Sequence, residues 1–269
     1  MPQVTLKKQN EIVIAATSDL HGHLEGIRQV CDDNNVDILI IAGDIQPADI
    51  YYHCNDTACG HWFRNTFFKK VKSLDCEVVA IPGNHDFWLN SLLHGEFGTP
   101  SYCTSKFFIP DNFHLLCDSE IIIKGLRIFG SPWVPFINGR WCFERHSLLN
   151  TWDAIPDGLD VLVTHTPPSV LGSDIDVSLD NDPRWQRHFG DHYLGKRIRD
   201  RSPTLAICGH IHSGDHDCLR IHNDILNRDS CVYNVSRVNE RYSIAYPLRI
   251  LSIGNGSVSE INPDSSALK

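Results

Sequence analysis

Five short polar clusters carry the residues of this chain that are best suited to chemistry, and each directly follows an apolar run. In chain order they are Asp19-Leu20-His21, Gly43-Asp44, Gly83-Asn84-His85-Asp86, Thr164-His165 and Gly209-His210-Ile211-His212. An apolar run that stops at a polar residue is typical of a buried strand, and ligands bind at the carboxyl ends of such strands in open α/β sheets. The order therefore predicts one site at a common rim.

The spacing within the clusters supports a shared site. In an extended segment, residues two apart face the same way, so Asp19 and His21 can reach one cation together, as can His210 and His212. Taken alone, the clusters at Asp19, Asp44 and Asn84 have ordinary explanations as turns or helix caps, and a single His165 proves nothing. The pair His210 and His212 is a stronger signal. Together, each after a strand, they make coincidence a remote explanation.

The combined donors are a mixture of oxygen and nitrogen, suited to Mn, Fe or Zn and unlike a calcium cage or a closed thiolate site. They are too many for one tetrahedral ion, and suit two divalent transition-metal ions about 3.5–4 Å apart that share a carboxylate. We expect Asp44 to be this bridge. Because two carboxylates balance only part of the charge of two divalent ions, the excess suits a phosphate group. The candidate metal ligands are Asp19, His21, Asp44, Asn84, His165, His210 and His212.

The elements that must position these residues indicate an α/β fold. Residues 36–42 are aliphatic apart from Asp37 and do not alternate with polar residues, as in a strand buried on both faces. Other strands are predicted at 11–17, 76–82, 160–164, 204–208, 231–235 and 248–252. Helices are predicted near 24–33, 61–73, from 87 onward, 140–152 and 194–200. Residues 121–129 predict a hairpin that turns at Lys124-Gly125, outside the alternation of strand and helix, and this hairpin indicates a second sheet.

Length and composition restrict the fold and the partners. With 269 residues, 42% of them hydrophobic, the chain can bury one large core, so we predict a single domain over residues 1–269. The formal charge of -9 opposes binding to duplex nucleic acid or to an anionic membrane. The ten cysteines are scattered, which indicates a reducing compartment. Because no signal core or membrane span is apparent, we expect a cytoplasmic protein; the sequence does not indicate its oligomeric state.

The segment 49–60 lies just past the predicted rim. Cys54, Cys59 and His61 could suggest zinc, but their spacing is poor and a fourth ligand is missing. A substrate-facing loop is the better interpretation.

Two further features leave their roles open. His23 either contacts the substrate or is an exposed loop histidine, and only geometry can decide between the two. Trp133, Phe136 and Trp141 lie in a proline-rich segment, where they either stack on a nucleobase or pack the loop down.

In this order, the clusters resemble the calcineurin-like metallophosphoesterases, whose pattern is D-x-H, G-D, G-N-H-[D/E], H and G-H-x-H. All blocks are intact, and the resemblance extends from about residue 12 to residue 213. The stretches 130–141, 155–158, 164–168 and 233–236 resemble the subgroup known as metallophosphoesterase-domain proteins. The resemblance implies a four-layer α/β/β/α sandwich of two packed mixed sheets, with a dimetal site at the strand-end rim.

The resemblance also implies a role for each residue. It assigns Asp19, His21, Asp44 and His212 to one metal, and Asp44, Asn84, His165 and His210 to the other. His85 is then not a ligand: it would lie beside the phosphate and act as the acid for the leaving alkoxide, with Asp86 as a candidate orienter. A metal-bound hydroxide would attack phosphorus in line.

The expected function is dimetal-dependent hydrolysis of a small phosphomonoester or phosphodiester, nucleotide-like esters included. Many family members that act on phosphoproteins carry an arginine after Gly-Asp, whereas Ile45-Gln46-Pro47 follow here, so a protein phosphatase is less expected. Two alternatives stay open. One is an inactive scaffold of this fold that binds a protein partner, which the intact ligands argue against; the other is a nuclease on short single strands.

Overall fold

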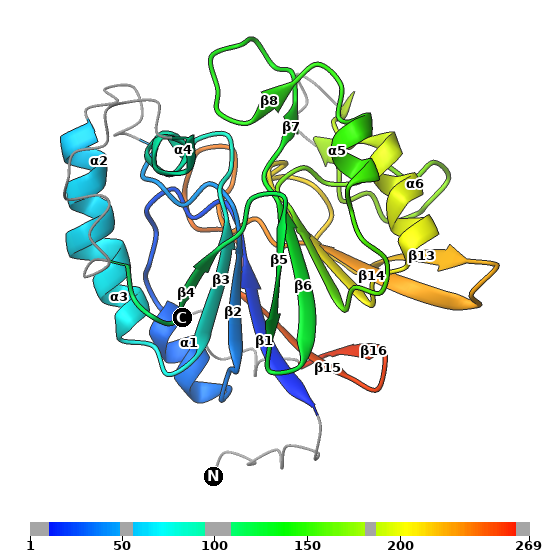
Figure 1. Ribbon diagram of the computed structural model, residues 1–269, viewed down its shortest axis with the longest axis horizontal. Helices are drawn as coiled ribbons and strands as arrows, with labels where there is room; N and C mark the ends of the chain where they lie inside the picture. Colours follow the sequence, from blue (N-terminus) through cyan, green and yellow to red (C-terminus); the bar gives the residue numbers. More distant parts are fainter. Residues whose placement is uncertain (1–10, 49–55, 95–108, 181–186, 262–269) are drawn as a thin grey trace.

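Two six-stranded sheets form the centre of the protein, in a computed structural model that describes residues 11–48, 56–94, 109–180 and 187–261 (Figure 1). In spatial order, the first sheet consists of β16 (Ser257–Glu260), β15 (Arg249–Gly254), β1 (Ile12–Thr17), β2 (Ile38–Ala42), β3 (Glu77–Ile81) and β4 (Phe113–Leu115). The second consists of β13 (Leu219–Asn223), β14 (Arg228–Asn234), β12 (Leu205–Cys208), β9 (Val161–Thr164), β6 (Leu126–Ser131) and β5 (Ser119–Ile123). Both sheets are mixed, because parallel central strands are flanked by antiparallel ones.

Helices cover the outer face of each sheet (Figure 1). On the first sheet they are α1 (Ile27–Asp33), α2 (Asp56–Trp62), a π-helical turn (Phe63–Phe67), α3 (Phe68–Lys72) and α4 (Phe87–His94). On the second they are α5 (Leu149–Asp153) and α6 (His192–Arg201). Two short pairs complete the described elements: β7 (Val134–Pro135) with β8 (Glu144–Arg145), and β10 (Leu179–Asp180) with β11 (Arg187–His188).

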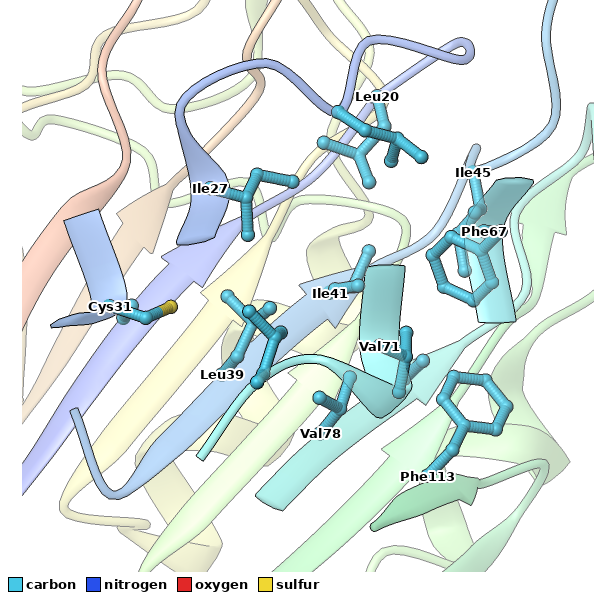
Figure 2. Close-up of a cluster of buried hydrophobic side chains, with 14 of the residues drawn as sticks. Leu20, Ile27, Cys31, Leu39, Ile41, Ile45, Phe67, Val71, Val78 and Phe113 are labelled. Carbon is cyan, nitrogen blue, oxygen red and sulfur yellow. The ribbon is translucent and has the colours of Figure 1, made fainter. Parts of the chain in front are cut away.

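The core has three hydrophobic clusters, one between each pair of neighbouring layers. Successive side chains of a strand point to opposite faces, so in β1 Val13 belongs to the helix-side cluster and Ile14 to the cluster between the sheets. Figure 2 shows the helix-side cluster, where Ile27 of α1 and Val71 of α3 pack toward Leu39 of β2. The third cluster joins α5 and α6 to the second sheet. This confirms the four-layer sandwich.

Parallel pairing brings the carboxyl ends of the central strands to one rim. β1, β2 and β3 run parallel in the first sheet, and β6, β9, β12 and β14 run parallel in the second. The predicted hairpin is present as β5 and β6, and its turn residues Lys124 and Gly125 have φ of 52° and 84°, as a two-residue type I′ turn requires. Five strands therefore deliver the predicted polar clusters to neighbouring loops.

The helix predicted over 140–152 is mostly wrong. Only 149–153 is helical, and 144–145 is a strand. Glu144 explains the difference, because its carboxylate accepts backbone N–H bonds from Ile137, Asn138, Gly139 and Trp141 at 2.7–3.2 Å. These bonds fix a compact loop in place of a helix, since a side chain that captures backbone N–H groups competes with helical bonding.

The predicted loop over 49–60 is wrong in its second half, because α2 begins at Asp56 and runs into the helical segment predicted from 61. Residues 49–55, which include Cys54, lie outside the described residues. Cys59 is buried in the helix-side cluster, whereas His61 is exposed. Because the zinc alternative requires Cys54, the described residues do not test it, and a substrate-facing role for residues 49–55 stays a prediction. Within the described part of the chain, no helix combines the length and apolar character needed to cross a membrane.

Candidate metal centre

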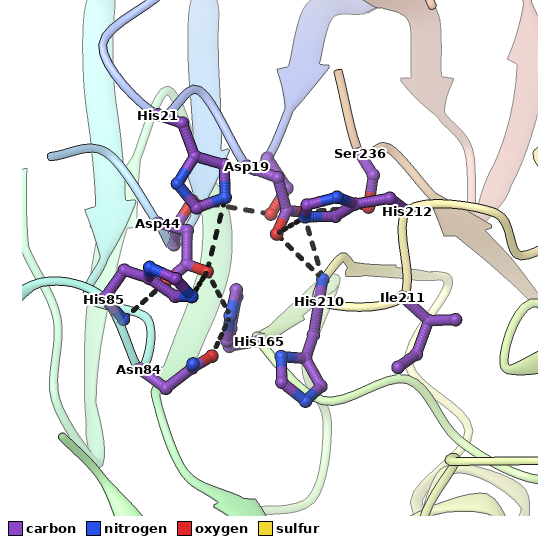
Figure 3. Close-up of polar contacts among 12 residues, drawn as sticks. Asp19, His21, Asp44, Asn84, His85, His165, His210, Ile211, His212 and Ser236 are labelled. Atoms are coloured by element: carbon purple, nitrogen blue, oxygen red, sulfur yellow. Dashed lines mark hydrogen bonds and ion pairs between the residues drawn. The ribbon is translucent and has the colours of Figure 1, made fainter. Parts of the chain in front are cut away.

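The loops that follow β1, β2 and β3 in one sheet and β9 and β12 in the other bring their polar side chains together (Figure 3). Three groups of candidate metal-binding residues have ligand atoms within 4.8 Å of one another. They are Asp19 with His21 and His212, His21 with Asp44 and His85, and Asp19 with Asp44 and His165. Because the groups share members, they form one continuous cluster of carboxylates and imidazoles.

The backbone at the rim adopts an uncommon conformation. Asp19, His21, Asp44 and His210 have φ of 51°, 42°, 53° and 70°, in the left-handed region that residues other than glycine rarely occupy. Such outliers concentrate at functional sites, where the surrounding structure holds them in place. Each strand end therefore turns sharply and directs its side chain into the cluster.

Asp44 lies at the centre of the cluster. Its Oδ2 is 3.4 Å from His165 Nε2, 3.7 Å from His21 Nε2 and 4.0 Å from His85 Nε2. Its Oδ1 accepts the backbone N–H of His85 at 2.8 Å. Gly43 makes this crowding feasible, because it has φ of 99° and a Cβ there would lie 2.5 Å from His165 Nδ1. One carboxylate thus faces imidazoles from both sheets.

Asp19 organises the other side of the cluster. Its Oδ1 lies 3.3 Å from His212 Nε2, and its Oδ2 accepts the backbone N–H of His210 at 3.0 Å. The hydroxyl of Ser236 donates to the same Oδ2 at 2.8 Å. Asp19 has no solvent exposure, so these bonds replace the water that an exposed carboxylate would have.

Backbone carbonyls orient two of the histidines. His165 Nδ1 lies 2.7 Å from the oxygen of Ala42, and His212 Nδ1 lies 3.2 Å from the oxygen of Asn239. A ring whose Nδ1–H donates to a carbonyl presents an unprotonated Nε2, which is the usual arrangement of a metal-binding histidine. Both Nε2 atoms face a carboxylate, His165 toward Asp44 and His212 toward Asp19.

The charges of the cluster are strongly coupled. Burial would raise the pKa of Asp44, but the imidazoles of His165 and His85 hold it well below its usual value. Burial alone would lower the pKa of His165, yet the Asp44 carboxylate raises it to about 9. Burial lowers the pKa of His21 and of His210 to about 3. Ionised carboxylates therefore coexist with neutral His21 and His210, whereas His165, whose pKa is raised, would have to release a proton to bind a metal.

His21 supplies an independent test of whether metal ions fit. Its side chain is buried, and both ring nitrogens have no hydrogen-bond partner among the described residues. Buried polar atoms in native proteins nearly always have a partner, and an ion is one accepted explanation for an exception. Asn84 adds a neutral oxygen, since its Oδ1 lies 3.1 Å from His165 Nε2. The donor set therefore fits divalent ions with mixed oxygen and nitrogen ligands.

The remaining predicted site residues differ in how closely they approach the cluster, and His85 belongs to one of its three groups. The ring of His210 is 5.0 Å from the ring of His165. His210 belongs to none of the three groups of candidate metal-binding residues. His85 is buried, and burial lowers its pKa. His23 is only partly buried, and its Nε2 lies 2.9 Å from the carbonyl oxygen of Tyr242. Its contact with substrate stays a prediction.

Asp86 was considered as a residue that orients His85, but its hydrogen bonds are to the backbone of two loops. Its carboxylate accepts backbone N–H bonds from Gly83, Ile45 and Gln46 at 2.8–2.9 Å. It thereby ties the loop after β3 to the loop after β2. Burial, followed by the charge of Asp44, raises the pKa of Asp86 to about 7.

The segment that closes the cluster from the C-terminal side was assigned no site role from the sequence, although its first residues belong to the stretch 233–236 that carries the family resemblance. Ser236 and Asn239 bond to Asp19 and His212, and the ring of Tyr242 lies 4.6 Å from that of His21. Trp141, which we considered only as a stacking or packing residue, lies 4.4 Å from the ring of His85. The contact of Asn239 uses its backbone carbonyl, which carries no signal in the sequence.

Phe136 and Trp133, considered as stacking residues, have other partners. The ring of Phe136 stacks on His146 at 3.9 Å. The guanidinium of Arg145 lies 3.4 Å from the centre of the Trp133 ring. Both contacts pack the loop itself, as the second of the two interpretations expected.

Known proteins share this sequence pattern and this fold. The family described as calcineurin-like phosphoesterase matches residues 12–214. The chain is 31% identical over 255 residues to metallophosphoesterase domain-containing protein 1 of Homo sapiens and of Mus musculus, which covers 86% of this chain and 69% of each relative. The crystal structure of TT1561 of Thermus thermophilus superposes with a TM-score of 0.51 at 13% identity, covering 93% of this chain and 98% of that one. The chain therefore belongs to the calcineurin-like phosphoesterase family.

Proposed function

We propose that the protein is a dimetal-dependent hydrolase of small phosphate esters, either monoesters or diesters, with nucleotide-like esters among the candidates. The observation that carries the proposal is the position of Asp44, whose Oδ2 faces Nε2 atoms of His21 from one sheet and His165 from the other at 3.7 and 3.4 Å. A carboxylate placed between two sets of nitrogen donors can bridge two cations. Family membership supports the reaction class.

The ligand assignment follows the two sides of the cluster. Asp19, His21, Asp44 and His212 would hold one divalent ion, and Asp44, Asn84, His165 and His210 would hold the other. Ions of Mn, Fe or Zn suit these donors, and when bound they would activate a water molecule and neutralise the phosphate oxygens. The strained turns at Asp19 and Asp44 direct both carboxylates inward before any ion arrives.

His85 would act as the acid for the leaving group. Its backbone N–H is fixed on Asp44 Oδ1, and its ring extends past the carboxylate, with Nε2 at 4.0 Å from Asp44 Oδ2. A ring in this place can reach an ester oxygen beside the ions without being needed as a ligand. His23 would contact the substrate from the opposite loop, and the partner is a small phosphorylated molecule.

The buried thiols support a reducing compartment such as the cytoplasm. Cys31, Cys76, Cys208 and Cys231 are free and buried within the hydrophobic clusters. Buried reduced cysteines behave as small hydrophobic residues.

The decisive experiment starts from metal-stripped protein resupplied with Mn, Zn, Fe or Mg. Elemental analysis would measure bound ions per chain, and release of alcohol or phosphate would be followed over a panel of phosphomonoesters and phosphodiesters. Two ions per chain, with turnover that depends on them, are expected. One ion at saturation would contradict the dimetal centre. Two ions without turnover of any ester would overturn the hydrolase and favour an inactive scaffold.

A further inference from the structure

Tyr242 lies over the candidate metal centre, although no motif contains it and it follows the residues 12–214 that match the family. Its ring is 4.6 Å from the ring of His21, 5.7 Å from that of His212 and 6.1 Å from that of His85. All three contacts are edge-to-face, with interplanar angles of 84°, 79° and 61°. One aromatic ring therefore borders both the ligands and the proposed acid.

The backbone holds Tyr242 in this place under strain. Its φ is 57°, in a region where a bulky side chain is a genuine outlier. The turn is fixed by Asn239, whose carbonyl accepts the N–H of Tyr242 at 2.8 Å, while its Oδ1 accepts the N–H of Arg241 at 2.9 Å. His23 Nε2 lies 2.9 Å from the Tyr242 carbonyl oxygen. Strain that is held by several independent bonds points to a functional role.

Core packing does not explain this side chain. Tyr242 is 40% exposed, whereas a tyrosine that only filled the interior would be covered. Its ring is thus in contact with the cluster and also accessible to a molecule that arrives from solvent. An aromatic ring in such a position offers an apolar surface with defined geometry.

A second ring borders His85 from a different segment. Trp141, in the loop between β7 and β8, lies 4.4 Å from the ring of His85 at an interplanar angle of 34°. The Glu144 carboxylate accepts its backbone N–H at 2.9 Å. Because Trp141 and Tyr242 come from loops far apart in the chain, the aromatic border of His85 is built by the tertiary fold.

We propose that Tyr242 and Trp141 are specificity-determining residues that select esters whose leaving alcohol carries a planar aromatic ring, such as benzyl alcohol or a nucleoside. The inference rests on the proposed function. An ester oxygen that receives a proton from His85 must come within about 3 Å of it, so the atoms next to that oxygen come close to both rings. Aromatic pairing would favour a planar group by about 2- to 12-fold for each ring.

The test uses two substrates that differ only in aromaticity, benzyl phosphate and cyclohexylmethyl phosphate, as monoesters and as methyl diesters. Both release a primary alkoxide of similar basicity, so both need the acid equally. In metal-loaded protein we expect the ratio of their kcat/KM values to favour benzyl. Tyr242→Leu and Trp141→Leu should each lower that ratio about 2- to 12-fold, mainly through KM, and Tyr242→Phe should preserve it.

Tyr193→Leu is the matched control, because Tyr193 is an exposed tyrosine on α6 and should leave the ratio unchanged. Calorimetry with benzylphosphonate and cyclohexylmethylphosphonate would measure the preference for the aromatic group in binding, without turnover. The metal content of each protein is checked beforehand. Equal ratios in the wild type and in both leucine variants would overturn the inference. A benzyl preference in phosphonate binding with no hydrolysis of any ester would support the aromatic walls while refuting the proposed function.

Discussion

Ser236 gives the sharpest test of whether residues that contact a candidate metal ligand, without being ligands themselves, support metal binding. Its hydroxyl is buried and lies 2.8 Å from both Asp19 Oδ2 and Asn234 Oδ1. A hydroxyl has one proton, and an ionised carboxylate is a stronger acceptor than an amide oxygen. We therefore expect the proton to be directed at Asp19. Ser236→Ala removes this donor and leaves the ligand itself in place.

The expected loss can be bounded from the contacts of Asp19. A hydrogen bond to a charged group contributes about 1.5–3 kcal/mol, and removal of an outer partner of a metal ligand weakens binding by about 10–100-fold. Asp19 Oδ2 keeps the His210 N–H at 3.0 Å, so the ligand stays partly oriented. The lower part of the range applies, and we expect metal affinity to fall about 10- to 30-fold.

Competition with a fluorescent metal chelator would measure this affinity at constant pH. Ser257→Ala is the control, because Ser257 is exposed and its hydroxyl donates to Gly254 O at 3.0 Å, in the turn between β15 and β16. It should bind metal like the wild type. An affinity of Ser236→Ala within twofold of the wild type would show that the Ser236 hydroxyl does not orient Asp19.

Three further substitutions test the centre and the core. Asp44→Asn should lose metal content and turnover together, whereas Asp32→Asn, at an exposed position of α1, should lose neither. Unchanged metal occupancy in Asp44→Asn would mean that another carboxylate is the bridge. His85→Ala should keep both ions while the rate falls about 10²–10⁴-fold, more for an aliphatic than for a nitrophenyl ester. Equal losses on both esters would mean that His85 positions the phosphate and is not the acid. Trp152→Ala should lower the free energy of unfolding by about 3–5 kcal/mol in urea, since Trp152 is fully buried; a loss below about 1 kcal/mol would contradict its packing role.

The central strands and their rim could be predicted because their signals are local. The run Ile38–Ala42 is buried throughout, as its lack of alternation indicated. The polar clusters at Asp19, Asp44 and His165 follow directly from such strands. A strand buried on both faces and a polar residue at its end are properties of consecutive residues, so they are readable without any tertiary information.

The segments that could not be predicted depend on contacts between distant residues. Glu144 converts the predicted helix over 140–152 into a loop by capturing N–H groups that precede it. Asn239 and Tyr242 reach His212 and His23 through their backbone carbonyls. Any residue type has such a carbonyl, so no pattern in the sequence marks Asn239 and Tyr242 as part of the site.

The division of the candidate ligands between two sheets also affects the stability of the fold. Asp19, Asp44 and Asn84 follow strands of the first sheet, and His165, His210 and His212 follow strands of the second. Ions that bind this set join the two halves of the sandwich, and a state in which the sheets have separated loses them. By mass action, each independent site at a free metal concentration of 100 times its Kd adds about 2.7 kcal/mol to the folded state. The available metal would thus set the free energy of unfolding of the sandwich, and the centre would act as a cross-link as well as a reaction site.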